Sequence, residues 1–207
     1  MIIQPIVEGH GEVGAIPVLL RRFLAEAGVH HINVGKPIRR KRSELVQEAS
    51  VRRSVRLALL QPDCGGILIV FDSDDDCPKD LAPQIEAWAR TEAGAIPCGV
   101  VMANREYEAW FLASLEALRG VRGIVEDAAD HATPEGPRNA KGELRRHMIA
   151  GRGYSESVDQ AAMTAKLDFG AAYRGCRSFQ TMVKAFGDVV GDMGVVVAPW
   201  PPGVWNA

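Results

Sequence analysis

The fold of this chain is decided by residues 65–76, which read GGILIVFDSDDD. Their apolar part, Ile67 to Phe71, is rich in β-branched side chains and follows two glycines, a pattern that predicts a buried strand. Aspartates follow the strand directly, at 72 and at 74–76. Ligands bind at the carboxyl ends of strands in parallel α/β sheets, so this stretch links the core to a candidate site.

Segments on both sides of this strand alternate between strand and helix patterns. We expect strands at 1–7, 30–34 and 99–102, and helices at 12–28, at 43–60 with Ser43 as its cap, from Asp80 onward, and at 107–115. Strands and helices that alternate at this spacing predict an α/β fold, a parallel sheet flanked by helices on both faces.

The composition changes after Arg119, where Gly, Pro, Asp and Arg become frequent. We expect a core domain over 1–119 and a smaller helical extension over 120–207. Helical patterns in the extension lie around 141–148, 158–166 and 178–186, and a Pro-rich tail follows at 199–203.

Composition excludes several classes of protein. The 207 residues carry 24 Lys and Arg against 26 Asp and Glu, so the net charge of -2 predicts neither a broadly basic nucleic-acid binder nor a disordered acidic chain. Four scattered cysteines without a C-x-x-C pair argue against a zinc ribbon and a disulfide framework, and they favour the cytoplasm. The longest apolar run is far shorter than the roughly 18 residues that span a bilayer, so we expect no membrane insertion.

Acidic residues follow three of the expected strands. They are Glu8 and Glu12 after the first, Asp72, Asp74 and Asp76 after the central one, and Glu106 and Glu108 after the last. Clustered carboxylates repel one another unless a cation neutralises them, and oxygen ligands suit Mg²⁺ or Mn²⁺. Strand alternation predicts that Asp72 and Asp74 point to the same side. The alternative is a solvated turn whose aspartates cap the next helix.

A competing motif is the G-x-G-x-x-G of residues 9–14, which is typical of dinucleotide-binding turns. Glu8 and Glu12 would place negative charge against a pyrophosphate. The acid expected about 20 residues further on is also missing. These features argue against a dinucleotide site.

Three motifs together resemble the TOPRIM fold of topoisomerases, primases and OLD-type nucleases. They are Val7-Glu8-Gly9-x-x-Glu12, Val70-Phe71-Asp72-Ser73-Asp74 and Glu106-Tyr107-Glu108-Ala109-Trp110. The resemblance covers about residues 1–119. It is strongest to stand-alone TOPRIM-like proteins of the domain-of-unknown-function-4276 type, which occur with ATPase partners in phage-defence settings.

The resemblance implies roles for individual acids. It places divalent metal on Glu8, Asp72 and Asp74, makes Glu12 the second acid of the nuclease-type motif, and matches Glu108 to the acid that opens the helix after the last core strand. The chain departs from the family pattern at His10 and Gly11 and in its acidic run up to Asp76. Asp76 and Glu108 therefore join the candidate metal ligands.

Basic residues are concentrated in 36–56, which holds eight basic side chains against two glutamates. The candidates for nucleic-acid binding are Arg39, Arg40, Lys41, Arg42, Arg52 and Arg53; a solvated charged face is the alternative. A second set, Arg138, Lys141, Arg145, Arg146 and Arg152, is a candidate for the other side of a groove. Lys166 matches a basic position after the core in the resembled proteins, where a lysine offsets phosphate charge, and is taken as a catalytic candidate.

The expected function is a Mg²⁺- or Mn²⁺-dependent nuclease acting on DNA or RNA, with catalytic residues Glu8, Glu12, Asp72, Asp74 and Lys166. An ATPase partner is implied by the resemblance alone, and a homo-oligomer is compatible with the sequence. Two other functions stay open. One is a non-catalytic TOPRIM subunit that binds nucleic acid and a partner, and the other is a phosphatase or phosphotransferase with Asp72 as nucleophile and Asp74 as acid.

Overall fold

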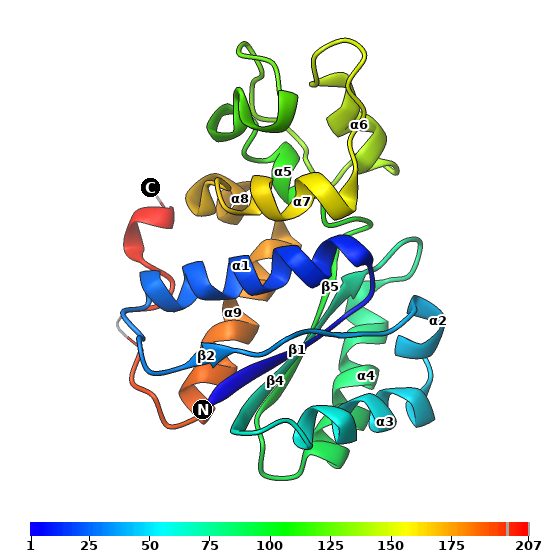
Figure 1. The fold of residues 1–207 in the computed structure, drawn as a ribbon, viewed down its shortest axis with the longest axis vertical. Coiled ribbons are helices and arrows are strands. Elements are labelled where there is room, and N and C mark those ends of the chain that lie inside the picture. The colour runs from blue at the N-terminus through cyan, green and yellow to red at the C-terminus, as the bar shows by residue number, and fades with distance from the viewer. Residues whose placement is uncertain (198, 207) are drawn as a thin grey trace.

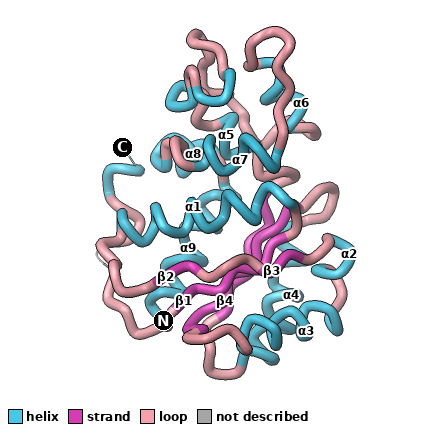
Figure 2. The backbone as a smooth tube through the Cα atoms, in the orientation of Figure 1, coloured by secondary structure: helices cyan, strands magenta, loops and turns pink. Residues whose placement is uncertain are grey.

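The computed structural model describes residues 1–197 and 199–206, and a parallel β-sheet lies at its centre (Figure 1, Figure 2). Over these residues the sheet has five strands: β1 (Ile2–Val7), β2 (Asn33–Val34), β3 (Ile38–Arg39), β4 (Cys64–Asp72) and β5 (Cys98–Ala103). Their order is β2-β1-β4-β5, and β3 pairs with β1 further along the same edge as β2. All pairings are parallel, so the carboxyl ends of the strands share one side of the sheet.

Helices cover both faces of the sheet, because side chains along each strand alternate between the faces. Ile67, Ile69 and Phe71 pack with α3 (Glu48–Leu59) and α4 (Pro78–Ala93). Leu68 and Val70 pack with α1 (His10–Glu26) and α9 (Arg177–Asp192). The α/β prediction is therefore confirmed.

The chain after Arg119 contributes to the same core. It forms α6 (Ala140–Arg146), α7 (Glu156–Thr164), α8 (Phe169–Gly175), α9 and the short η3 (Gly203–Asn206). Helix α7 packs along α1, and α9 lies against β4 and β5 (Figure 1). The boundary near Arg119 stays a prediction, but α9, which lies beyond it, shares the covering of one sheet face with α1.

The helix expected over 43–60 is broken in the structure into α2 (Arg42–Leu45) and α3, and Ser43 lies inside α2 rather than capping α3. Leu45 of α2 and Val51 of α3 are both buried in the core cluster that α3 and α4 form with one face of the sheet. Six residues correspond to about 240° around a helix, so one continuous helix would have pointed these side chains to different faces. The break at 46–47 lets both reach the core.

Three smaller differences complete the comparison. The strand expected near 30–34 is short and is followed by β3, and α8 was not predicted. In place of the helix expected over 107–115, the structure has the four-residue helix α5 (Ala109–Leu112). The 3-10 turns η1 (Glu116–Leu118) and η2 (Val121–Gly123) follow it. No helix in the described part of the chain is long and apolar enough to cross a membrane.

Candidate functional site

Carboxylates gather at the carboxyl edge of the sheet, and we call this group the acidic cluster. Its members are Glu8, Glu12, Asp72, Glu106, Glu108 and Glu156. Glu8 follows β1 and Asp72 ends β4, and the pairing of Val7 with Val70 puts these strand ends side by side. Asp72 also pairs with Ala103 at the end of β5, so the acids that follow β1, β4 and β5 lie at the same edge of the sheet.

Glu8 lies half-buried at the entrance to the cluster. Burial raises its pKa to about 7, and the charges of Asp74 and Glu12 act in the same direction. One of its carboxylate oxygens, Oε2, is buried without a hydrogen-bond partner. Glu8 therefore has an unused ligand oxygen facing other acids.

Glu12 lies in the first turn of α1, folded back over Gly9. A Cβ at Gly9 would collide with the Glu12 carboxylate, and a Cβ at Gly11 would collide with the side-chain amide of Gln160 on α7. The glycines of this turn thus make room for an acid and for a neighbouring helix, and a pyrophosphate would meet the Glu12 carboxylate. Burial raises the pKa of Glu12, and Glu156 raises it further.

Asp72 is the most central acid of the cluster. Its side chain accepts a hydrogen bond from the backbone N–H of Tyr107 at 2.8 Å, and only 7% of the residue is exposed. Burial raises its pKa well above the ordinary value, and the charges of Glu108 and Glu12 add to the effect. Asp72 is therefore an acid whose charge is poorly compensated by the protein.

Glu108 is fully buried and comes from the turn after β5. Its Oε1 accepts hydrogen bonds from the Tyr154 hydroxyl at 2.6 Å and from the Gln160 amide at 3.3 Å, while Oε2 has no partner. Burial raises its pKa to about 7, against the opposing effects of Lys141 and Tyr154. The segment after residue 119 thus holds one oxygen of Glu108 and leaves the other free.

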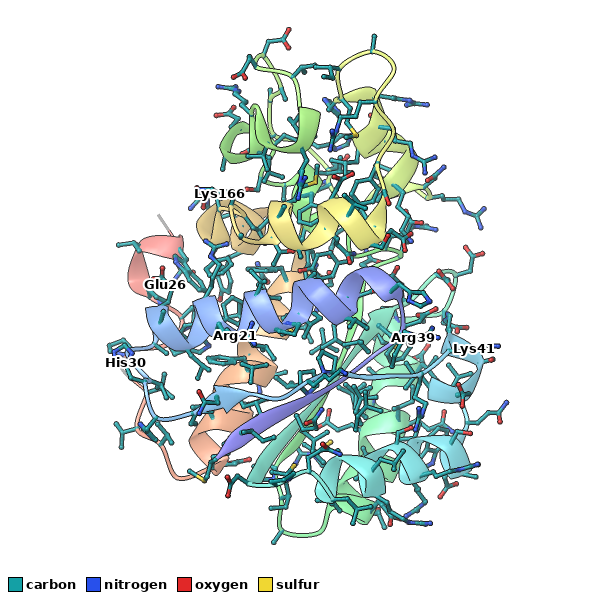
Figure 3. The ribbon with its side chains drawn as sticks, viewed as in Figure 1. Arg21, Glu26, His30, Arg39, Lys41 and Lys166 are labelled. Carbon is teal, nitrogen blue, oxygen red and sulfur yellow. The ribbon has the colours of Figure 1, made fainter. Side chains whose placement is uncertain are left out.

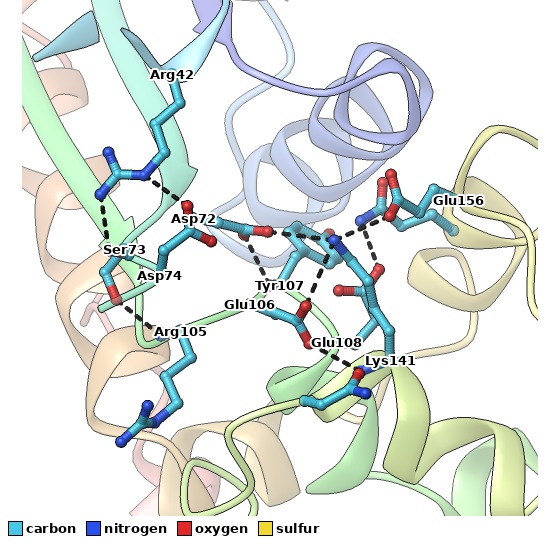
Figure 4. Close-up of polar contacts among 12 residues, drawn as sticks. Arg42, Asp72, Ser73, Asp74, Arg105, Glu106, Tyr107, Glu108, Lys141 and Glu156 are labelled. Atoms are coloured by element: carbon cyan, nitrogen blue, oxygen red, sulfur yellow. Dashed lines mark hydrogen bonds and ion pairs between the residues drawn. The ribbon is translucent and has the colours of Figure 1, made fainter. Parts of the chain in front are cut away.

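Lys141, in the first turn of α6, places its ammonium among these acids (Figure 4). Its Nζ lies 2.9 Å from Glu156 Oε1, 3.7 Å from Asp72 Oδ2 and 3.7 Å from Glu106 Oε1. Its backbone N–H donates to Glu106 Oε2 at 2.9 Å. Burial lowers the pKa of Lys141, but Glu108 and the other acids outweigh this and leave the pKa above its usual value.

Asp74 and Asp76 lie outside the cluster, in the turn after β4. Arg42 pairs with Asp74 (Figure 4) and also with Asp76. Arg42 Nε lies 2.7 Å from Asp74 Oδ2, and its Nη2 donates to Asp76 and to the backbone oxygen of Ser73. Strand β4 ends at Asp72, and Asp74 has a left-handed backbone conformation (φ 50°). The alternation of side chains along a strand therefore does not extend to Asp74, and it does not point the Asp72 and Asp74 carboxylates to the same side. Asp74 still lies close enough to raise the pKa of Glu8.

Lys166 is not brought to the acids. It is exposed in the turn after α7 and borders a recess with Arg22 and Glu26, at the end of α1 opposite to Glu12 (Figure 3). About 20 Å of helix separates Glu12 from Glu26. Lys166 therefore lies away from the acidic cluster, and the lysine whose ammonium lies among the acids is Lys141.

The predicted basic stretch divides into two parts. Arg39, the last residue of β3, and Lys41 are both exposed (Figure 3). Arg39 pairs with Val7, the residue before Glu8, and Arg40 donates to the Ser54 hydroxyl. Arg52 and Arg53 lie on α3, where Arg52 pairs with Glu48 and Glu92. Arg39, Arg40, Lys41 and Arg42 therefore adjoin the site, and Arg52 and Arg53 belong to a separate helix.

The chemistry of these donors fits a divalent cation, although their present arrangement is not yet a metal site. Within residues 1–197 and 199–206, no three Asp, Glu, His or Cys side chains are grouped so that they could hold a metal ion as they stand. Buried oxygens of Glu8, Glu12 and Glu108 nevertheless lack partners, and hard oxygen donors are what Mg²⁺ and Mn²⁺ prefer. Coordination would require these carboxylates to rotate toward one another.

Sequence reasoning did not identify most of the residues that the chain beyond Arg119 places around the acids. Tyr154, Glu156 and Gln160 come from around the start of α7, and Glu106 was noted only as an acid after a strand. Lys141 was assigned to a groove wall. Its contact with Asp72 joins positions 69 residues apart, and no local pattern at 139–142 marks such a contact.

Comparison with known proteins gives one match. A family model described as "Domain of unknown function (DUF4276)" matches residues 7–186, which include the whole acidic cluster. No curated protein and no solved structure matches the chain.

Proposed function

The chain belongs to the DUF4276 family, and from the geometry of its acidic cluster we propose that it is a divalent-metal-dependent nuclease that hydrolyses the phosphodiesters of DNA or RNA. The observation that carries the proposal is the convergence of Glu8, Glu12, Asp72 and Glu108, with raised pKa values and three unpartnered buried oxygens. Buried carboxylates that lie this close together repel one another, and a bound cation would relieve that repulsion and so stabilise the folded protein.

The residues have distinct roles in this proposal. Glu8, Glu12, Asp72 and Glu108 would hold Mg²⁺ or Mn²⁺, and Asp74 and Asp76 would have to leave their ion pairs with Arg42 before they could join them. A cation bound there acts as a Lewis acid and lowers the pKa of a bound water. The charges of Asp74 and Glu12 help to raise the pKa of Glu8, and a divalent cation bound to its carboxylate would offset that repulsion.

Positive charge around the cluster supports a polyanionic substrate. Arg39 and Lys41 flank the Glu8 side, and a recess of about 260 Å³ lined in part by His10 and Arg145 opens on the Glu156 side. Neither His10 nor Arg145 makes a side-chain hydrogen bond or ion pair within the described part of the chain. We assign these four side chains to backbone phosphates, which attract basic groups irrespective of sequence.

The finer relationship to TOPRIM proteins belongs to the same proposal. It is supported by the parallel sheet and by the positions of Glu8, Asp72 and Glu108 after successive core strands. The ATPase partner and the phage-defence setting rest on the resemblance alone. Cytoplasmic localisation is supported by free thiols at Cys64, Cys77, Cys98 and Cys176.

The phosphotransferase alternative has less support. It needs an accessible Asp72 nucleophile with Asp74 beside it as acid. Asp72 is 7% exposed, and the Asp74 carboxylate is paired with Arg42.

The test is a cleavage assay of the full chain on single- and double-stranded DNA and RNA, with Mg²⁺, Mn²⁺ or EDTA. We expect metal-dependent cleavage that Asp72→Asn reduces at least about 100-fold, because it removes a charged oxygen ligand. Asp75→Asn is the matched control, since Asp75 is exposed and pairs with Arg138 outside the cluster. Binding without cleavage by the wild-type chain would favour the non-catalytic subunit.

A further inference from the structure

Lys141 is held in place at both of its ends. Its backbone N–H is fixed by Glu106, its ammonium by Glu156, and α6 is capped by Asn139, whose Oδ1 accepts the N–H of Gly142 at 2.6 Å. Only 26% of the side chain is exposed. This lysine therefore belongs to the interior of the site.

Charge around Lys141 is unbalanced. Its Nζ lies within 3.7 Å of oxygens on Asp72, Glu106 and Glu156, and Glu108 acts on it electrostatically. One ammonium thus faces several acids, and no other lysine or arginine pairs with Asp72 or Glu108 within the described residues. Lys141 is the internal cation of this part of the site.

We propose that Lys141 is a tethered counter-ion that competes with the divalent cation for the acidic cluster, so that metal binding drives its ammonium away from Asp72. This inference rests on the proposed function. It identifies Lys141 as a positioning residue that keeps the metal-free site intact and weakens its affinity for metal.

Geometry makes the exchange feasible. The ammonium contacts Asp72 at 3.7 Å but Glu156 at 2.9 Å, so it can leave Asp72 and keep its closest partner. A lysine side chain rotates about four bonds, and the backbone contact with Glu106 keeps α6 in place meanwhile. A cation with two charges repels an ammonium a few Å away, and in a half-buried site this repulsion is large.

The first test measures Mn²⁺ affinity and thermal unfolding of the full chain for wild type, Lys141→Gln and Lys166→Gln. We expect Lys141→Gln to melt at a lower temperature without metal and to bind Mn²⁺ at least about tenfold more tightly, because a positive charge near the ligands is gone. Lys166→Gln removes an exposed lysine far from the cluster and should match wild type.

The outcomes separate the two proposals. Equal or weaker Mn²⁺ binding by Lys141→Gln, with normal binding by wild type, would overturn the counter-ion role and leave the nuclease proposal standing. Absence of Mn²⁺ binding in all three proteins would overturn both. Binding by Lys141→Gln alone would support the counter-ion role in its strongest form.

A second test uses the wild-type chain and does not depend on the variant folding. Amine-reactive labelling followed by mass spectrometry reports the accessibility of Lys141 and Lys166 with and without Mg²⁺. We expect Mg²⁺ to increase the labelling rate of Lys141 several-fold and to leave Lys166 unchanged. Unchanged labelling of Lys141 at a Mg²⁺ concentration shown to saturate the protein would contradict the exchange.

Discussion

Glu108 shows how a single side chain reveals the character of the site. It is fully buried, it receives hydrogen bonds from Tyr154 and Gln160 on one oxygen only, and burial raises its pKa to about 7. Between about pH 4.5 and pH 7, Glu108 therefore keeps a proton in the folded protein that it has already lost in the unfolded chain. Glu8, also raised to about 7, behaves in the same way.

The metal-free protein should therefore be more stable near pH 5 than near pH 8. The pKa values of Glu8 and Glu108 lie at about 7 in the folded state and near the ordinary glutamate value of 4.5 in the unfolded chain. Their contribution to stability is full below pH 4.5 and is lost as the pH rises through 7. Denaturant unfolding in EDTA should show a loss on the order of 2 kcal/mol over this range from Glu108 alone.

Glu108→Gln is the control for this pH dependence. It keeps the shape of the side chain and removes its titration, so the stability profile between pH 5 and 8 should flatten. A metal-free wild type that gains stability from pH 5 to pH 8 would contradict the assignment of uncompensated acids.

For single residues, the sequence predicted where the acids of the cluster lie but did not predict which basic side chain lies among them. Glu8, Asp72 and Glu108 follow apolar strands directly, and parallel strands bring such positions together by geometry alone. Lys141 and Tyr154 reach the same place through loops whose course no periodicity encodes. Lys166 was chosen by its sequence position after the core, and the structure places it beside Glu26, at the other end of α1 from Glu12.

The turn from β1 into α1 is the element that shapes the cluster. Glu12 folds over Gly9 so closely that a methyl group on Gly9 would meet its carboxylate. Because that carboxylate is the end of a flexible side chain, Gly9→Ala should displace Glu12 rather than unfold the helix.

We expect Gly9→Ala to lower Mn²⁺ affinity about tenfold, the effect of weakening one ligand among several, with little change in melting temperature. Gly191→Ala is the control, since a methyl group at this exposed position of α9 meets no atom and should stabilise the protein by up to about 1 kcal/mol. Unaltered metal binding by Gly9→Ala would remove Glu12 from the ligand set.

The segment from β3 to α2 presents basic side chains beside Glu8. Reversing Arg39 and Lys41 to glutamate should weaken nucleic-acid binding and reduce the slope of log affinity against log salt by about 0.9 for each lost contact on duplex DNA. The same reversal at Arg52 and Arg53 should have a smaller effect, because α3 carries them away from the Glu8 edge. A larger effect from Arg52 and Arg53 would place the nucleic acid on α3.

Helix α3 also shows the limit of periodicity. Apolar spacing predicted a helical region. The break at 46–47 was not predicted, and it allows Leu45 and Val51 to be buried in the same core cluster. That burial is tertiary, and a window along the sequence does not contain it.

Over the whole molecule, the sheet depends on helices from both ends of the chain. Gly66 of β4 approaches Val189 of α9 so closely that a Cβ at this position would collide with it, and Gly99 of β5 lies within van der Waals reach of the same valine. The strands were predictable because β-branched runs mark them, whereas α9 docks on β4 and β5 through contacts between residues 90 (Gly99 and Val189) and 123 (Gly66 and Val189) positions apart in the sequence. The change in composition after Arg119 reflects the shorter helices and turns that follow it, and it does not predict that α9 packs on β4 and β5.

A fragment of residues 1–119 should therefore fail to fold cooperatively. It exposes the apolar face formed by Leu68, Val70 and Val101, which α9 helps to cover in the full chain. Thermal unfolding followed by circular dichroism should show no sharp transition, and the fragment should aggregate on size-exclusion chromatography. A monomeric fragment with a cooperative transition would instead support an independent domain ending at 119.

The central claim is that the acidic cluster binds the divalent cation of a nuclease, and anomalous diffraction from a crystal grown with Mn²⁺ tests it most directly. We predict a Mn²⁺ peak about 2.1 Å from oxygens of Asp72 and of at least one of Glu8, Glu12 and Glu108, with the Lys141 ammonium displaced from Asp72. No peak at this edge of the sheet at a saturating Mn²⁺ concentration, with Lys141 still between Asp72 and Glu156, would contradict the account.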